Sequence, residues 1–349
     1  MRLTLPFVIA GLLAAAPAGA QDDGHRLALR DMIRAFGPGA YQGRNNGPEQ
    51  TERFSRKVKI GRDGRFSLAN ISGDLVVTGG TGDEVTIDAV KRTRGDKSEL
   101  ARVQIAVDDR AGRVDVRTEY AQNRGDRNRW TDHVSVDYTV TIPASASVDL
   151  HSISGTIKVT GVHGSLRSDT ISGNITISDA PKLEAAKSVS GDVLLTGIST
   201  DGDVSASSIS GNVRAKGLKA RGLDLGIISG DISVSDVTCE RLGVKSVSGS
   251  VEYAGAIVKG GRYEINAHSG TVRLLLANPA GFELNANSFS GSIRSELPLT
   301  IVGDAARRDG SARGRRDGMN SHSMRATFGD GSATLVVRTF SGDIVIAKR

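Results

Sequence analysis

A Ser-Gly dipeptide, usually preceded by one apolar residue, recurs along this 349-residue chain at nearly constant intervals. The serines of the regular series are Ser154, Ser172, Ser190, Ser210, Ser229, Ser248, Ser269 and Ser290. They are separated by 18, 18, 20, 19, 19, 21 and 21 residues, and outlying copies occur at Ser72 and Ser341. Self-similarity at a fixed period is typical of stacked-repeat architectures, in which a repeat buries its apolar face only against its neighbours.

The residues that flank each dipeptide alternate between apolar and polar. Two and four residues after the glycine the chain is mostly aliphatic, as at Ile175 and Ile177, and similar pairs precede the serine, as at Val204 and Ala206. A period of two is typical of half-buried strands, and like residues can stack at about 4.8 Å in successive rungs. The sequence therefore predicts an all-β, single-stranded parallel β-solenoid (β-helix-like) of about 19–21-residue rungs, with an irregular N-terminal part from Phe54 to Leu150.

The position directly before the serine is also apolar in most copies, with Ile171, Ile209 and Phe340 as examples and His268 as the exception. We place this column at the edge of the core, which makes His268 a structural histidine rather than a ligand. The glycine that follows the serine is expected where the backbone needs a positive φ or where two rungs approach closely.

Small polar residues follow the glycine in every copy. They are Asp74, Thr156, Asn174, Asp192, Asn212, Asp231, Ser250, Thr271, Ser292 and Asp343. Such side chains cap backbone groups at bends, so we interpret the column as a ladder of turn residues. The alternative is a calcium-binding or ice-binding ladder, but the calcium β-roll has a nonapeptide period, about half of the period found here.

The first twenty residues predict a secretory signal peptide. Arg2 supplies a positive start, the run from Leu3 to Ala16 is apolar, and Ala18-Gly19-Ala20 provides a cleavage site. The apolar run is too short for a stable transmembrane helix. We therefore expect an exported mature chain without a transmembrane segment, located in the periplasm, at the outer membrane or at the cell surface.

The chain divides into three expected segments. They are a signal peptide at 1–20, a short helix and linker at 21–50, and a solenoid domain at 51–349 with a basic flexible loop at 303–324. The helix is expected at 26–36 because its apolar residues share one helical face. A second excursion is expected at 119–132, around Trp130.

The charge balance favours an anionic partner. The formal net charge is +6 and the isoelectric point is about 9.5, which suits an anionic polysaccharide, lipopolysaccharide or an envelope protein. Export argues against nucleic acid. The candidate anion-binding residues are five arginines of the expected loop, Arg307, Arg308, Arg313, Arg315 and Arg316.

The sequence contains none of the common catalytic or metal-binding motifs, and its six histidines have no ligand spacing. We expect no catalytic, cofactor-binding or metal-binding residues and no cofactor. The single cysteine, Cys239, cannot form an intramolecular disulfide and is expected to be buried and inert. The Arg-Gly-Asp tripeptides at 94–96 and 124–126 are interpreted as coincidence rather than as integrin ligands.

Several phrases of the sequence resemble one bacterial family. They are SVDLHSISGTIKVTGVHG, TISGNITISD, SVSGDVLLTG and the terminal TFSGDIVI. Together they resemble the bacterial "putative adhesin" domain of unknown function, with its Ser-Gly-Asp-Ile repeats, over roughly Phe54 to Arg349. The resemblance implies a β-solenoid at a cell envelope or surface, and it implies no catalytic or ligand residues.

Three functions remain open from the sequence. The first is a non-enzymatic envelope or surface protein with a role in adhesion or scaffolding. The second is a carbohydrate-active β-helix enzyme, which would need paired carboxylates on adjacent rungs of a groove. The third is an accessory factor of the cell-envelope stress response.

Overall fold

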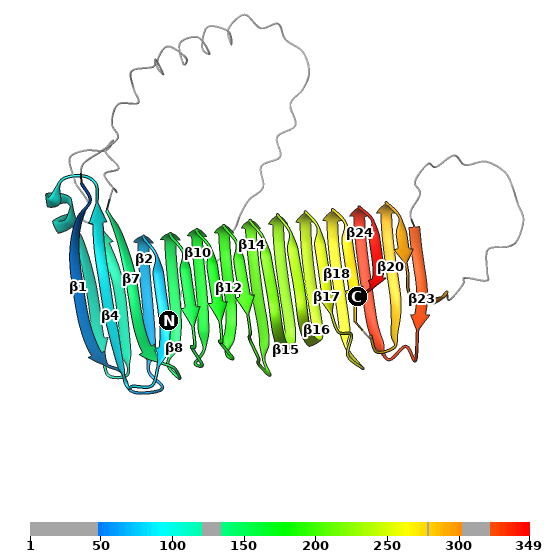
Figure 1. Cartoon of the computed structure of the whole chain (residues 1–349), viewed down its shortest axis with the longest axis horizontal. Helices are drawn as coiled ribbons and strands as arrows, with labels where there is room; N and C mark the ends of the chain where they lie inside the picture. Colours follow the sequence, from blue (N-terminus) through cyan, green and yellow to red (C-terminus); the bar gives the residue numbers. More distant parts are fainter. Residues whose placement is uncertain (1–47, 121–133, 278, 302–321) are drawn as a thin grey trace, which may run out of the picture. The chain divides into compact units, whose positions relative to one another are not determined.

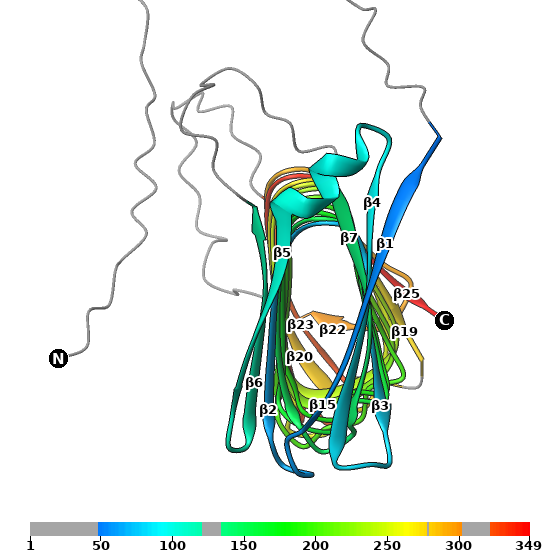
Figure 2. The ribbon, with the colours of Figure 1, turned by 90° about the vertical axis from the view of Figure 1, so that its left-hand side faces the viewer.

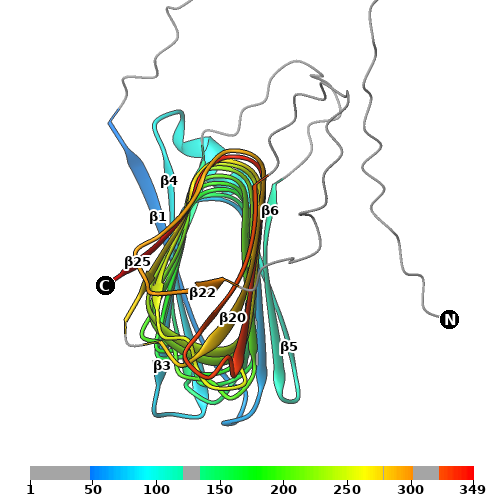
Figure 3. The same cartoon turned by 90° about the vertical axis from the view of Figure 1, so that its right-hand side faces the viewer.

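The computed structural model of the chain describes residues 48–120, 134–277, 279–301 and 322–349. In this part the chain winds into flattened coils that stack along one axis (Figure 1), and the end-on views show each coil as an elongated oval (Figures 2 and 3). A coil consists of a strand that ends at a Ser-Gly bend, a second strand that runs back, and a return turn. Successive coils pair in parallel, so the predicted all-β solenoid is confirmed.

The strands that lead into the bends form one wall of the stack, and the strands that leave them form the other. In stack order, the first wall contains β5 (Val103–Arg110), β6 (Arg113–Tyr120), β2 (Arg65–Ser72), β8 (Ser147–Ser154), β10 (Leu166–Ser172), β12 (Leu183–Ser190), β14 (Asp203–Ser210), the second halves of β15 (Val213–Ser229) and β16 (Ile232–Ser248), β18 (Arg262–Ser269), β24 (Ala333–Ser341), β20 (Phe282–Ser290), β23 (His322–Phe328) and β22 (Thr300–Ile301). The second wall contains β1 (Gln50–Lys59), β4 (Glu84–Thr93), β7 (Ser135–Pro143), β3 (Leu75–Gly80), β9 (Ile157–Thr160), β11 (Ile175–Ser178), β13 (Val193–Thr196), the first halves of β15 and β16, β17 (Val251–Gly255), β19 (Val272–Leu276), β25 (Ile344–Lys348) and β21 (Ile293–Ser295).

The order of coils in the stack differs from their order in the chain at both ends. The last coil of the chain, β24–β25, lies between β18–β19 and β20–β21 (Figure 1). At the other end, β2–β3 lies inside the coil formed by β6 and β7. The repeat spacing does not predict this order, because it records only distances along the chain.

Antiparallel strands terminate the stack at both ends, beside the parallel pairs that the sequence predicts. β1 pairs antiparallel with β4, β5 with β6, and β23 with β20 and β22. The edge strand β1 carries Arg53, Arg56 and Lys57 on exposed positions. Charged edge strands resist further pairing, so these strands close the ends of the stack.

A short 3-10 helix, η1 (Lys97–Arg102), follows β4 and is absent from the sequence-based expectation.

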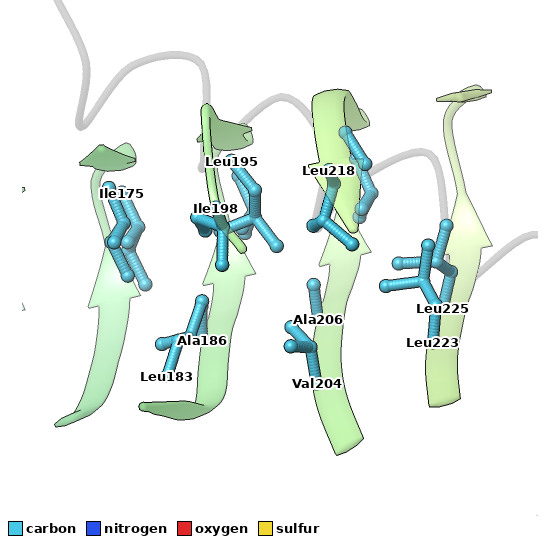
Figure 4. Packing of buried hydrophobic residues seen from close by; sticks show 14 of the residues in the cluster. Ile175, Leu183, Ala186, Leu195, Ile198, Val204, Ala206, Leu218, Leu223 and Leu225 are labelled. Atoms are coloured by element: carbon cyan, nitrogen blue, oxygen red, sulfur yellow. The ribbon is translucent and has the colours of Figure 1, made fainter. Parts of the chain in front are cut away.

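The core is a set of aliphatic columns enclosed between the two walls. Positions two and four residues after the bend glycine are buried in nearly every coil, as at Ile175, Leu195 and Ile232. Figure 4 shows core residues of successive coils packed against one another. Among them are Val204, Ala206, Leu223 and Leu225, which lie on the strands that lead into the bends. The predicted core columns are therefore confirmed, with the end coil as an exception because Ile293 and Ser295 are only half-buried.

The bend glycines are required by both conformation and packing. Their φ angles lie between 114° at Gly73 and 157° at Gly173, in a region that side chains with a Cβ rarely adopt. A Cβ on Gly211 would also overlap the carbonyl oxygen of Gly191 in the neighbouring coil. The Gly211 N–H donates to the carbonyl of Ser229 on the other side, 3.0 Å away. All ten Ser-Gly copies therefore lie in one column, in register.

The polar residues after the glycine form the predicted ladder of bend caps. The side chain of Asn174 accepts from the backbone N–H of Asp192, and Asp192 accepts in turn from the N–H of Asn212, both at 2.8 Å. Asn212 continues the series by accepting from Asp231 at 3.0 Å. The N–H of Asn212, helped by the Arg214 guanidinium, lowers the pKa of the Asp192 carboxyl. The stabilisation from this carboxylate is therefore present above the ordinary pKa of about 3.9 and is lost as the pH falls through the lower, folded-state value.

Substitution of Ile232 by Asp should reduce the free energy of unfolding by about 3–5 kcal/mol, because it places an unpaired charge in the closed core. Ser233→Asp, one residue further on the outer face, is the matched control and should cost less than about 0.5 kcal/mol. Thermal and urea unfolding measure both values. Equal losses would show that the column assignment is wrong.

Gly211→Ala should destabilise the stack by about 2–4 kcal/mol, since the new Cβ adds an overlap between coils to the strain of a positive φ. Gly197→Ala is the control, because Gly197 also has a positive φ, of 60°, but open space around the position of a Cβ. It should cost about 1–2 kcal/mol. An equal loss in the two variants, measured by urea unfolding, would mean that the contact between bends contributes nothing.

Candidate functional site

The apolar residue before each serine points outward, which corrects its expected place at the edge of the core. Strand alternation explains this direction. Leu150 and Ser152 face the interior, so the next residue, Ile153, faces outward and is 46% exposed. We call this column the outer ladder. Its members, in stack order, are Ile71, Ile153, Ile171, Val189, Ile209, Ile228, Val247, His268, Phe340 and Phe289.

In most coils a hydroxyl group occupies the buried position beside the bend. The hydroxyl residues are Ser152, Thr170, Ser188, Ser208, Ser246, Thr339 and Ser288, whereas Asn70, Ile227 and Ala267 take this position in the other coils. Ser188 donates to the carbonyl of Gly173 at 3.0 Å, Ser208 to that of Gly191 at 2.9 Å, and Ser288 to that of Gly342 at 3.1 Å. In these coils the hydroxyl supplies a donor to a bend carbonyl, and the alternation of the strand turns the next residue outward. Continuing the period of two from Val204 and Ala206 toward the bend would have predicted this arrangement.

The outer ladder is a continuous apolar line on the surface. Seven members are 42–52% exposed, namely Ile153, Ile171, Val189, Ile209, Ile228, Val247 and Phe340. Nine coil spacings of about 4.8 Å give it a length of about 43 Å. A contiguous apolar surface of this kind marks an interaction site more often than scattered apolar residues do.

Aromatic rings end the ladder at its C-terminal side. The rings of His268 and Phe340 are stacked, with centroids 4.9 Å apart and an angle of 9° between their planes. Phe289 stacks on Phe340 from the next coil, with centroids 4.7 Å apart and an angle of 6°. The parallel rings cover one another's faces and present their edges outward. His268 is therefore an exposed member of the ladder, not a residue at the core edge.

A groove runs beside the ladder at the N-terminal end of the first wall. Backbone pairing of β6 with β2 ends at Ala69↔Arg117, whereas β2 pairs with β8 as far as Ser72↔Ser154. Beyond Arg117 the contact passes through side chains, with the Thr118 hydroxyl 2.9 Å from the Asn70 side-chain oxygen. The resulting groove has a volume of about 710 Å³, and its surface is mostly apolar.

Five ladder residues line the groove, and charged side chains stand at its rim. The ladder residues are Ile71, Ile153, Ile171, Val189 and Ile209. The rim contains Arg117 and Glu119 of β6 and His151, Asp169 and Lys187 of the wall. These strands belong to neighbouring coils, so only the folded stack brings the two groups together.

His151 lies between two carboxylates. Its Nε2 is 3.1 Å from an oxygen of Asp149, and its Nδ1 is 3.6 Å from an oxygen of Asp169 in the next coil. The carboxylate side chains are 44% and 43% exposed.

A partly cationic column runs along the same face, two residues before the ladder. Lys187, Lys245 and Arg338 precede Val189, Val247 and Phe340 on their strands. Arg338 is within 3.3 Å of Glu264, whereas no ion pair of Lys187 or Lys245 is present among the described residues. The column beside the ladder is therefore mixed: it holds these three cationic residues together with Asp169 and several uncharged residues.

The five arginines predicted to bind anions, Arg307 to Arg316, lie outside the described residues and stay a prediction. So do the segments at 1–47 and 121–133, which contain the expected signal peptide, the expected helix, Trp130 and the second Arg-Gly-Asp tripeptide. In the first tripeptide, Asp96 caps η1 by accepting from the Ser98 N–H at 2.9 Å, which gives its carboxylate a structural role.

Cys239 is buried as predicted, and burial raises the pKa of its thiol to about 12. Burial likewise raises the pKa of Tyr138 to about 12. These groups lie in the core, away from the ladder. Within the described ranges, no group of three or more His, Cys, Asp or Glu side chains is placed to hold a metal ion. The same ranges contain no helix with the length and apolar character needed to cross a membrane.

A β-solenoid with an exposed apolar ladder defines the class of this protein. The sequence matches the Toastrack DUF4097 family over residues 74–347, so the chain belongs to this family. The family is one of unknown function. No curated protein matches the chain.

Several solved bacterial structures are similar to the chain. A "putative adhesin" from Parabacteroides distasonis is 13% identical, with a TM-score of 0.36, and the match covers 87% of this chain and 98% of that one. A "putative adhesin" from Bacteroides fragilis is 12% identical, with a TM-score of 0.35 and coverages of 84% and 97%. A "putative lipid binding protein" from Parabacteroides distasonis is 15% identical, with a TM-score of 0.34 and coverages of 87% and 98%.

Proposed function

We propose that the protein is an exported, non-enzymatic scaffold of the bacterial envelope that attaches to a partner through the outer ladder. The observation that supports this function is the line of seven apolar side chains, each 42–52% exposed, that the register of the coils creates. Full burial of one such side chain contributes about 1.5–3 kcal/mol. Covering several half-exposed members at once is therefore sufficient to drive association.

The arrangement of polar groups fits binding better than catalysis. The groove has a mostly apolar surface, and its two acidic side chains are separate: Glu119 lies on β6, and Asp169 is 43% exposed and lies 3.6 Å from His151. The groups whose pKa is most strongly raised by burial, such as Cys239 and Tyr138, lie in the core. In this proposal residues 1–20 direct export, and residues 51–349 form the scaffold in the periplasm, at the outer membrane or at the cell surface.

Replacing Ile228 and Val247 by Thr should weaken binding to isolated bacterial envelope membranes by at least about tenfold, a loss of about 1.4 kcal/mol. Threonine keeps the β-branched shape, so the melting temperature should change little. The control is Ser205→Thr with Asn266→Thr, which alters polar outward positions of the same wall away from the groove. Co-sedimentation measures binding. Equal binding of the ladder variant and the wild type would contradict the proposed role of the ladder.

The basic segment gives a separate prediction about an anionic partner. Serine at 307, 308, 313, 315 and 316 should weaken binding to lipopolysaccharide and flatten its dependence on salt, because exposed charges are screened within about 8–10 Å at physiological ionic strength. Titration across a salt series measures both effects. If the variant binds lipopolysaccharide with the affinity and the salt dependence of the wild type, these arginines do not take part in binding.

A further inference from the structure

We propose that the groove between β6 and the outer ladder binds the hydrocarbon chain of an anionic amphiphile, with Lys187 facing its head group. This inference rests on the proposed function, since it names the ligand class for one end of the ladder. Three features of the groove carry it: its walls, its length and the charge at its rim.

The walls of the groove are suited to a hydrocarbon chain. Five aliphatic ladder residues from five successive coils line its length, and Arg117, Thr118 and Glu119 of β6 line the end beside β2. The Thr118 hydroxyl is turned inward, 2.9 Å from Asn70 and 2.7 Å from the Tyr138 hydroxyl, so it is already satisfied. The surface that a ligand meets is therefore mostly aliphatic.

The dimensions of the groove suit a long, thin ligand. Its five ladder residues span four coil spacings, about 19 Å at about 4.8 Å each. Its volume of about 710 Å³ falls within the range of about 300–1,000 Å³ that small-molecule sites occupy. A straight hydrocarbon chain can contact all five aliphatic side chains, whereas a compact ligand can contact only two or three.

The charges at the rim favour an anionic head group near β12. Lys187 has no ion pair among the described residues, and it lies on the fourth of the five coils that line the groove, two residues before Val189. Of the negative groups, Asp169 is the register neighbour of Lys187 in the adjacent coil and lies 3.6 Å from His151 without forming an ion pair with Lys187, and Glu119 is on β6 at the opposite end. A carboxylate or phosphate beside Lys187 would be an ion pair that the free protein lacks.

Palmitate and hexadecyltrimethylammonium test the proposal, because they share the chain and differ in head-group charge. Calorimetric titration of the full mature protein below micellar concentrations should show saturable binding of palmitate, at least about tenfold tighter than that of the cation. Ile153→Thr with Ile171→Thr should weaken palmitate binding by at least about tenfold. Lys187→Gln should weaken palmitate binding but leave that of hexadecyltrimethylammonium unchanged.

Ile228→Thr with Val247→Thr is the matched control, since both residues belong to the ladder but not to the groove. It should bind palmitate as the wild type does. Equal palmitate binding by the groove and control variants would overturn the proposal, as would equal affinity for the two head groups. A groove that binds neither probe, because another part of the chain fills it, would overturn it as well. The proposed function is judged separately, by whether the control variant loses binding to envelope membranes.

Discussion

The structure depends on the contact between successive Ser-Gly bends. Each bend glycine has a positive φ. All but Gly291, in the end coil, donate the N–H to a serine carbonyl of one neighbouring coil, and all but Gly73, which meets Val136, leave no room for a Cβ against a glycine of the other. This contact fixes the stacking register at one point of every coil. The register of all other columns follows, because the strands that leave the bend have a period of two.

The same constraint that closes the core also creates the outer ladder. Inward hydroxyls such as Ser188 and Ser208 donate to the carbonyls at the bend, and the alternation of the strand turns the following residue toward solvent. Strand propensity alone would be met equally by threonine at this position. Isoleucine, valine and phenylalanine there remain about half exposed and so add little to the core. In the proposed function, contact with a partner gives these side chains a physical role.

Local patterns were sufficient to predict much of the fold. The aliphatic columns, the bend glycines, the capping residues and the buried Cys239 all follow from spacing and alternation, and the structure confirms them. The predicted place of Ile153 and its equivalents at the edge of the core was wrong, because apolar character alone favours the interior whereas the strand period turns these residues outward. The insertion of β24–β25 between two other coils and the separation of β6 from β2 depend on pairing between distant segments. Neither the groove nor the antiparallel ends could therefore be found by reading along the chain.

Hydroxyl-radical footprinting of the mature protein, with and without envelope membranes, tests the central claim that the ladder is an open binding surface. In the free protein, Phe340 and Ile171 should be oxidised readily, whereas Phe282 and Ile175 in the core should be protected. Added membranes should protect the ladder residues and leave the return turns unchanged. Protection of Phe340 to the same degree as Phe282 in the free protein would contradict the account, and so would labelling of the ladder that membranes do not alter.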